Sequence, residues 1–155
     1  MPPNNAHIRH LARLTGLIAL ALWATGCSTL ITEPSPHVLN IVLDDGSISP
    51  DKRLVASGNV LFRAINTGSE VHELVIIKTD LPADSLPMQD SIVDEGRAGR
   101  VIGEIEEFPP GRTKEQVFEL APGRYVLFCN IIEEEDEGEL ESHYRSGMRA
   151  VLTVR

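Results

Sequence analysis

Three features are scarce in this 155-residue sequence: cysteine, basic side chains and long apolar runs. With only two cysteines, the chain is not a small scaffold held together by disulfides. Its 14 lysines and arginines are outnumbered by 23 acids, which gives a formal net charge of -9. A nucleic-acid-binding surface needs the opposite surplus, so the composition argues against a nucleic acid as partner. The 42% hydrophobic and 24% charged residues are ordinary for a globular protein.

The main apolar run near the N-terminus is too short to cross a membrane. It covers residues 14–23 (LTGLIALALW), and ten helical residues at about 1.5 Å each reach only half of a bilayer core of about 30 Å. Arg9 and Arg13 precede this run and small residues follow it, which is the order of a secretory signal peptide. The small residues end at Cys27, so the stretch resembles the lipobox of bacterial lipoproteins, in which cleavage before the cysteine is followed by lipidation of its thiol.

This pattern predicts three segments. Residues 1–26 are expected to be a lipoprotein signal peptide, and residues 27–36 a lipidated tether rich in Ser, Thr and Pro. Residues 37–155 are expected to form the folded domain. We expect an exported protein, anchored through lipid on Cys27 at the periplasmic or extracytoplasmic face of a bacterial membrane. The alternative is a chance cysteine after an ordinary cleavage site.

From residue 37 onward the apolar runs are short and rich in Val, Ile and Phe, which is typical of β-strands. Turn signals such as 44–46 (DDG) and 109–111 (PPG) separate them. Residues 79–100 lack a clear period and are expected to be a long connection, in which a short helix could form. Roughly seven to eight strands in a segment of this length predict an all-β fold, a Greek-key two-sheet β-sandwich. The predicted strands cover 38–43, 59–66, 71–78, 101–106, 113–120, 124–129 and 148–154.

Side-chain alternation along these strands places three chemically distinctive residues on apolar faces at strand ends. His72 lies near the start of its strand, Cys129 at the end of its strand and Met148 at the start of the last strand. His143 comes five residues before Met148. The four side chains supply two imidazoles, one thiolate and one thioether, which is the ligand set of a blue-copper site. The pattern therefore indicates one copper ion.

Each of these residues also has an ordinary explanation. His72 could be a satisfied or surface histidine, Cys129 a small buried hydrophobe and Met148 a filler of the core. A nucleophilic Cys129–His143 pair would make the chain an enzyme, but the acids that follow the cysteine raise the pKa of its thiol, so we expect no enzyme. Structural zinc is the less suitable metal because Met is not among its ligands.

The residues around these four are similar to motifs of the cupredoxin family, which includes plastocyanin and azurin. Residues 66–73 (NTGSEVHE) resemble the family's N-x-G-x-x-x-H segment. Residues 123–130 (GRYVLFCN), followed by 143–148 (HYRSGM), resemble its G-x-Y-x-x-x-C…H-x-x-x-G-M ending. The resemblance extends from about Val60 to Val154, and residues 120–125 also resemble a tyrosine corner.

The resemblance implies a single type 1-like copper that transfers electrons one at a time between redox proteins. His72, Cys129 and His143 would be the strong ligands and Met148 the axial one. It also implies that Asn130 or its neighbour forms a hydrogen bond near the metal and braces the loop before His72. Copper carriage, buffering or delivery by the same site is the main alternative function, and a metal-free binding module is another.

One segment departs from the family pattern. Residues 130–142 separate Cys129 from His143, where the family has only a few residues, and this length leaves open how firmly His143 is held. The segment could be a solvated loop, a docking face at 133–141 for a basic redox partner, or a weak site for calcium or accessory copper. Its seven acids are Glu133, Glu134, Glu135, Asp136, Glu137, Glu139 and Glu141.

Overall fold

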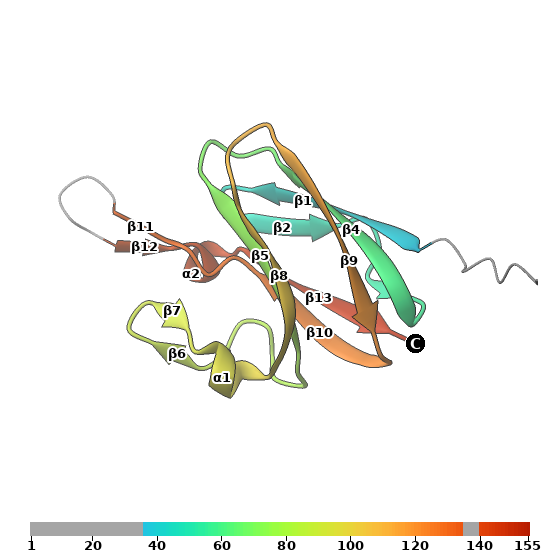
Figure 1. Ribbon diagram of the computed structural model, residues 1–155. Helices are drawn as coiled ribbons and strands as arrows, with labels where there is room; N and C mark the ends of the chain where they lie inside the picture. The colour runs from blue at the N-terminus through green and yellow to red at the C-terminus, as the bar shows by residue number, and fades with distance from the viewer. Residues whose placement is uncertain (1–35, 135–139) are drawn as a thin grey trace, which may run out of the picture. The chain divides into compact units, whose positions relative to one another are not determined.

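The computed structural model describes residues 36–134 and 140–155 (Figure 1). The described residues all belong to one compact unit, Pro34–Arg155. The predicted signal peptide, Cys27 and most of the predicted tether lie outside the described residues. Among the residues that are described, no helix has the length and apolar character needed to cross a membrane.

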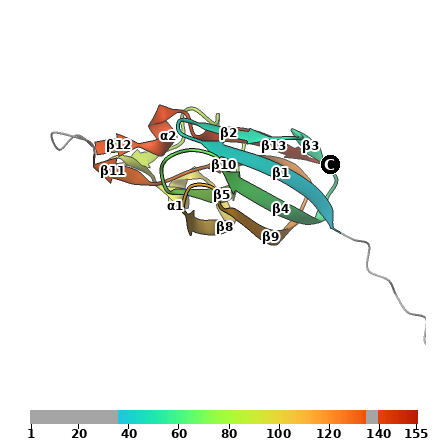
Figure 2. The same ribbon diagram turned by 90° about the horizontal axis from the view of Figure 1, so that it is seen from above.

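Two β-sheets pack face to face (Figures 1 and 2). All strand pairs are antiparallel except β1 with β4 and β13 with β3. The first sheet has the order β2 (Ser47–Pro50), β1 (His37–Asp44), β4 (Gly58–Asn66) and β9 (Thr113–Leu120). The second has the order β3 (Leu54–Val55), β13 (Arg149–Val154), β10 (Gly123–Phe128), β5 (His72–Lys78) and β8 (Arg100–Phe108). Neighbouring strands are often distant in sequence, and the predicted two-sheet sandwich is confirmed.

All seven predicted strands are present, with ends that differ by at most two residues. They correspond to β1, β4, β5, β8, β9, β10 and β13. The sequence did not predict the short strands β2 and β3, which add to sheet edges. It also missed the hairpins of β6 (Met88–Gln89) with β7 (Ile92–Val93) and of β11 (Ile132–Glu134) with β12 (Leu140–Ser142). The two helices have one turn each: α1 (Glu95–Ala98) and α2 (His143–Ser146).

The inner faces of the two sheets form the main core, as strand alternation predicts. Phe62 of β4 and Phe118 of β9 meet edge to face at 5.1 Å between ring centroids. Cys129 and Met148 belong to this same core cluster. The expected tyrosine corner is also present, because the Tyr125 hydroxyl donates a hydrogen bond to the Ala121 carbonyl at 2.6 Å. The core therefore extends to the residues that were predicted to bind metal.

A second, smaller cluster covers the outer face of β5 and β10. It explains why these strands are apolar on both faces, since residues 79–100 fold over them instead of leaving them in water. Tyr144 of α2 fixes this cover: its hydroxyl donates to the Ala83 carbonyl at 2.8 Å and accepts from the Leu86 amide at 2.9 Å. The cluster consists of Val75, Ile77, Leu86, Val93, Ala98, Val126, Phe128 and Tyr144.

Candidate metal centre

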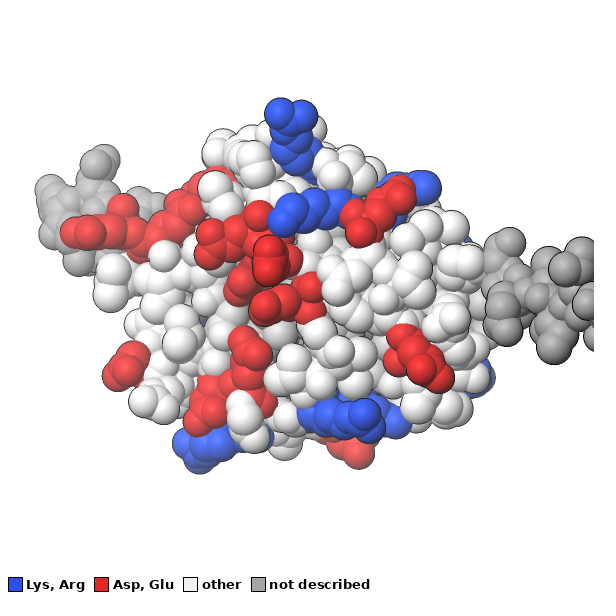
Figure 3. Space-filling model, viewed as in Figure 1, with Lys and Arg blue, Asp and Glu red and all other residues white. Residues whose placement is uncertain are grey.

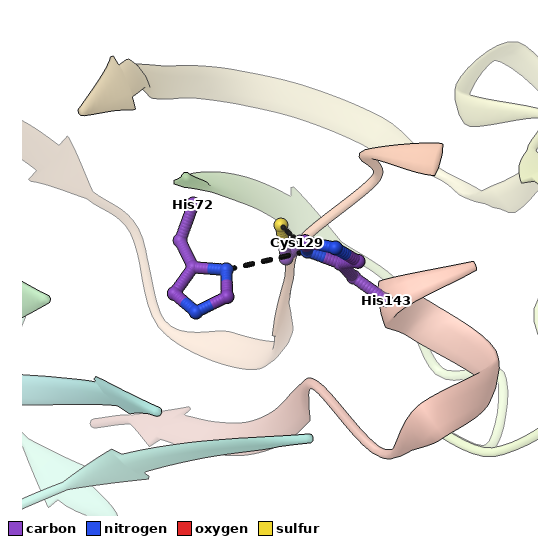
Figure 4. A group of neighbouring side chains, drawn as sticks. All are labelled: His72, Cys129 and His143. Atoms are coloured by element: carbon purple, nitrogen blue, oxygen red, sulfur yellow. Dashed lines mark hydrogen bonds between the residues drawn. The ribbon is translucent and has the colours of Figure 1, made fainter. Parts of the chain in front are cut away.

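His72, Cys129 and His143 come together at one end of the sandwich (Figure 4). His72 is the first residue of β5, Cys129 follows β10 directly and His143 is the first residue of α2. The Nδ1 atoms of the two imidazoles are 3.2 Å apart, and the Cys129 Sγ lies 3.4 Å from the His143 Nδ1. The exposed fraction of the three residues is 0 to 2%, so water does not surround their ligand atoms. We call these three residues the inner group.

The hairpin of β11 and β12 keeps Cys129 and His143 close despite the long segment between them. Its strands pair Ile132 with Ser142, and the His143 amide donates to the Ile131 carbonyl at 3.1 Å. The segment therefore leaves the sandwich and returns to nearly the same point. The sequence left open how firmly His143 is held, and the paired base of the hairpin answers that question.

The turn of α2 leads the chain from His143 back into the second sheet. Ser142 caps this turn, and the Met148 amide donates to the His143 carbonyl at 3.0 Å. Gly147 ends it with a φ of 121°, a conformation that favours glycine. A Cβ at Gly147 would also lie 2.6 Å from the Gly46 carbonyl oxygen. The glycine before Met148 is thus required by backbone conformation and by space.

Asn66 shapes the loop that leads to His72. Its buried side chain donates to the carbonyls of Glu70, at 2.8 Å, and Phe108, at 3.0 Å, and accepts from the Gly68 amide at 3.0 Å. All the hydrogen-bonding capacity of this amide, apart from one lone pair, is therefore used on backbone groups. The asparagine of the N-x-G-x-x-x-H segment is a brace for the loop.

Asp45 holds the His72 ring from the other side. Its Oδ1 lies 3.1 Å from the His72 Nε2, and its carboxylate accepts from the Ser69 amide and hydroxyl. These Ser69 hydrogen bonds are the main reason that the pKa of Asp45 is lowered to about 2, so the carboxylate stays charged. A carboxylate on the outer nitrogen orients the ring and directs Nδ1 inward. Sequence reasoning missed Asp45, which it had assigned only to a turn.

Gly68 makes the approach of Asp45 to His72 possible. A Cβ at this position would lie 2.0 Å from the Asp45 Oδ1 and 2.9 Å from the His72 Nε2. Any larger residue would therefore displace the carboxylate or the imidazole. The glycine of the N-x-G-x-x-x-H segment is explained by this contact.

The outer nitrogen of His143 has a different environment. Its Nε2 is buried and makes no hydrogen bond. The Glu70 Oε2 lies 3.4 Å away and the Glu133 Oε1 3.9 Å away, within ion-pair range but without hydrogen-bond geometry. Burial raises the pKa of Glu70, and the nearby charge of Glu133 raises it further. His143 therefore faces the inner group on one side and two acids on the other.

Cys129 is a neutral thiol when no metal is bound. Burial raises its pKa to about 12, because the apolar surroundings disfavour a thiolate. Its amide donates to the Met148 carbonyl at 3.1 Å, which continues the ladder of β10 and β13 beyond the strand end. Met148 is fully buried in the same core cluster as Cys129. Its role as an axial ligand stays a prediction.

Asn130 serves mainly the covering segment. Its side chain accepts from the Val93 amide at 2.7 Å and donates to the Val93 carbonyl and to the Glu95 carboxylate. Its backbone amide donates to the Glu73 carboxylate at 3.0 Å, next to His72. Asn130 therefore contacts the neighbourhood of the site as expected, while the bracing of the His72 loop comes from Asn66.

The inner group fits a copper ion by donor chemistry and spacing. Metal–nitrogen bonds of about 2.0–2.1 Å place two nitrogen ligands of one ion roughly 3.3–3.6 Å apart. The 3.2 Å between the two Nδ1 atoms is close to this range. The Cys129 Sγ, whose bond to a metal would be longer at about 2.3 Å, lies 3.4 Å from the His143 Nδ1. Two imidazoles with a thiol in a dry pocket suit copper, which accepts both nitrogen and sulfur.

Comparison with solved structures finds several blue copper proteins. Auracyanin from Roseiflexus castenholzii matches with 22% identity and a TM-score of 0.53, over 78% of this chain and 98% of that one. Auracyanin A from Chloroflexus aurantiacus, a "blue" copper protein, matches with 21% identity and a TM-score of 0.50, over 78% and 100%. Rusticyanin matches with 17% identity and a TM-score of 0.51, over 78% and 81%.

Comparisons by sequence add nothing to this result, since neither a family model nor a curated protein matches the chain. Identities of 17 to 22% establish a likeness of fold. The two-sheet topology, the tyrosine corner and the convergence of His72, Cys129 and His143 agree with that likeness. The chain therefore has the cupredoxin fold of these blue copper proteins.

Proposed function

We propose that this protein binds one type 1-like copper ion and transfers single electrons between redox partners. His72, Cys129 and His143 would be the strong ligands, with Met148 as the axial one. The observation that carries the proposal is the approach of the His72 Nδ1 and the Cys129 Sγ to the His143 Nδ1, at 3.2 and 3.4 Å, with all three residues buried. Bound copper would supply exchange between Cu(I) and Cu(II), and no substrate would be transformed.

The residues around the inner group support this role because they hold the ligands in one arrangement. Asp45 orients the His72 ring, the base of the β11–β12 hairpin positions His143, and the ladder of β10 and β13 positions Cys129. Ligands that are fixed in advance need little rearrangement when one electron moves. The buried pocket also excludes water, which would otherwise reorganise around the changing charge.

The charge distribution supports a basic redox partner. Figure 3 shows acidic side chains gathered from the β11–β12 end toward the middle of one face. Glu73, Glu104, Glu106 and Glu107 line one open hollow on β5 and β8. Complementary charge speeds association and orients the partner. We propose docking on the acidic segment 133–141, with export and a lipid anchor on Cys27 keeping the protein at the membrane face.

The visible and paramagnetic-resonance spectra of the copper-loaded protein test the proposal. An intense thiolate-to-Cu(II) band, with fast and reversible reduction, is expected for electron transfer. A colourless protein that retains Cu(I) and passes it on would instead favour copper delivery. Cys129→Ser should abolish the thiolate-to-Cu(II) band and the binding of copper at the inner group. Failure of the unmodified protein to take up copper would support a metal-free binding module.

A further inference from the structure

His143 belongs to two groups of potential ligands at once. Its Nδ1 faces His72 and Cys129, and its Nε2 faces Glu70 and Glu133. The ligand atoms of Glu70, Glu133 and His143 all lie within 4.8 Å of one another. We call these three residues the outer group. They come from the loop before β5, from β11 and from α2.

The Nε2 of His143 is the observation that makes the outer group more than a cluster of acids. The side chain is 98% buried, yet this nitrogen has no hydrogen bond. A buried polar atom without a partner is costly, so such atoms usually have a ligand or water. Two ligand atoms on one ion with bonds of about 2.0–2.2 Å lie roughly 3.3–3.6 Å apart. The 3.4 Å from Nε2 to Glu70 has that spacing, and the 3.9 Å to Glu133 is slightly longer.

The charges of the outer group are also those of a cation site. In the described part of the chain, neither Glu70 nor Glu133 forms an ion pair with a lysine or arginine. Asp45 and Glu141 add further negative charge near Glu70. One imidazole and two carboxylates are suitable ligands for a divalent first-row ion, and Cu²⁺ binds such ligands more tightly than the earlier ions of the series.

The position of the outer group suggests what it does. The inner group is almost completely buried, so an ion needs a path to it. The side chains of Glu70 and Glu133 are 31% and 36% exposed, while His143 is only 2% exposed. The outer group thus lies between solvent and the inner group, and His143 is shared by both.

We propose that Glu70, Glu133 and the Nε2 of His143 form an outer binding site for divalent copper, from which the inner group is loaded. This proposal rests on the proposed function, because it takes the inner group as the destination. When the copper ion moves inward, it leaves two carboxylate oxygens and the Nε2 of His143. Its new ligands are the Nδ1 atoms of His72 and His143 and the Cys129 sulfur. The thiol proton leaves to solvent, and no electron moves.

Loading kinetics test the proposal. Cu²⁺ is mixed with the metal-free protein, and the thiolate-to-Cu(II) band is followed over time. The double variant Glu70→Gln with Glu133→Gln should slow the appearance of the band at least tenfold and leave its final intensity unchanged. Glu115→Gln with Glu119→Gln is the matched control, because it removes two exposed charges of β9. Equal rates in the two double variants would overturn the proposal.

A binding measurement separates this proposal from the proposed function. Zn²⁺ is titrated by calorimetry into metal-free protein that carries Cys129→Ser, so that the inner group offers zinc no thiolate, with near-ultraviolet circular dichroism to confirm folding. Affinity for Zn²⁺ should fall at least tenfold in the Glu70/Glu133 variant and stay within twofold in the Glu115/Glu119 variant. The single variants Glu70→Gln and Glu133→Gln replace the double one if it does not fold. Weakened Zn²⁺ binding without a thiolate band would uphold the outer site and reject the electron-transfer function, whereas unchanged Zn²⁺ binding would reject the outer site.

Discussion

Copper uptake should release a proton from Cys129 even at alkaline pH. Burial raises the pKa of this thiol to about 12, whereas an ordinary cysteine has a pKa of about 8.5. At pH 9 the buried thiol is almost fully protonated, so binding should release about one proton from it for each copper. An ordinary cysteine would release only about 0.2 under the same conditions.

The assay is calorimetry of copper binding in two buffers that differ in ionisation enthalpy. The difference between the two heats gives the number of protons released, and pH 9 lies above the range in which ordinary histidines titrate. A value near one supports a protonated, desolvated thiol as the ligand. A value near 0.2 would refute the reasoning, because it would mean that the thiol is already a thiolate or lies in water.

Three further predictions concern the stability of the metal-free protein. It should lose stability as the pH rises from about 9 toward 12, since the folded state retains the Cys129 proton that the unfolded state gives up. Urea unfolding should show this loss, and the loss should be smaller in Cys129→Ser, where Tyr125, whose pKa is also raised by burial, still contributes. Gly147→Ala should lower the free energy of unfolding by more than about 1 kcal/mol, because φ is positive there and the added Cβ would meet the Gly46 carbonyl oxygen. The loss should exceed that of Gly111→Ala, where φ is also positive but no atom lies near the added Cβ. Equal losses in thermal unfolding would contradict the role of the contact. Tyr125→Phe should lower the free energy of unfolding by about 0.5–1.5 kcal/mol, and no loss in urea would show that the tyrosine corner does not contribute.

The long elements of the fold could be predicted because their signals are local. The main strands, such as β4, are short runs rich in Val, Ile and Phe, and successive side chains of β4 alternate between buried and less buried positions. His72, Cys129 and Met148 were placed on inner faces for the same reason, and they lie there. The distance between ligands, in contrast, depends on contacts between sheets that no single strand encodes.

The parts that were missed depend on tertiary contacts. The α2 helix is one turn long, and its capping by Ser142 and Gly147 becomes visible only with the fold in place. The closure of the β11–β12 hairpin sets His143 beside Cys129, although its acidic sequence resembles a solvated loop. Asp45 contacts His72 from a turn far away in sequence, without a local pattern that marks it.

X-ray absorption spectroscopy at the copper edge of the loaded protein tests the central claim most directly. Two imidazole nitrogens and one short sulfur bond should surround the copper. A first coordination shell of nitrogen and oxygen alone in the unmodified protein would contradict the account, because the buried thiol would then play no part in holding the metal.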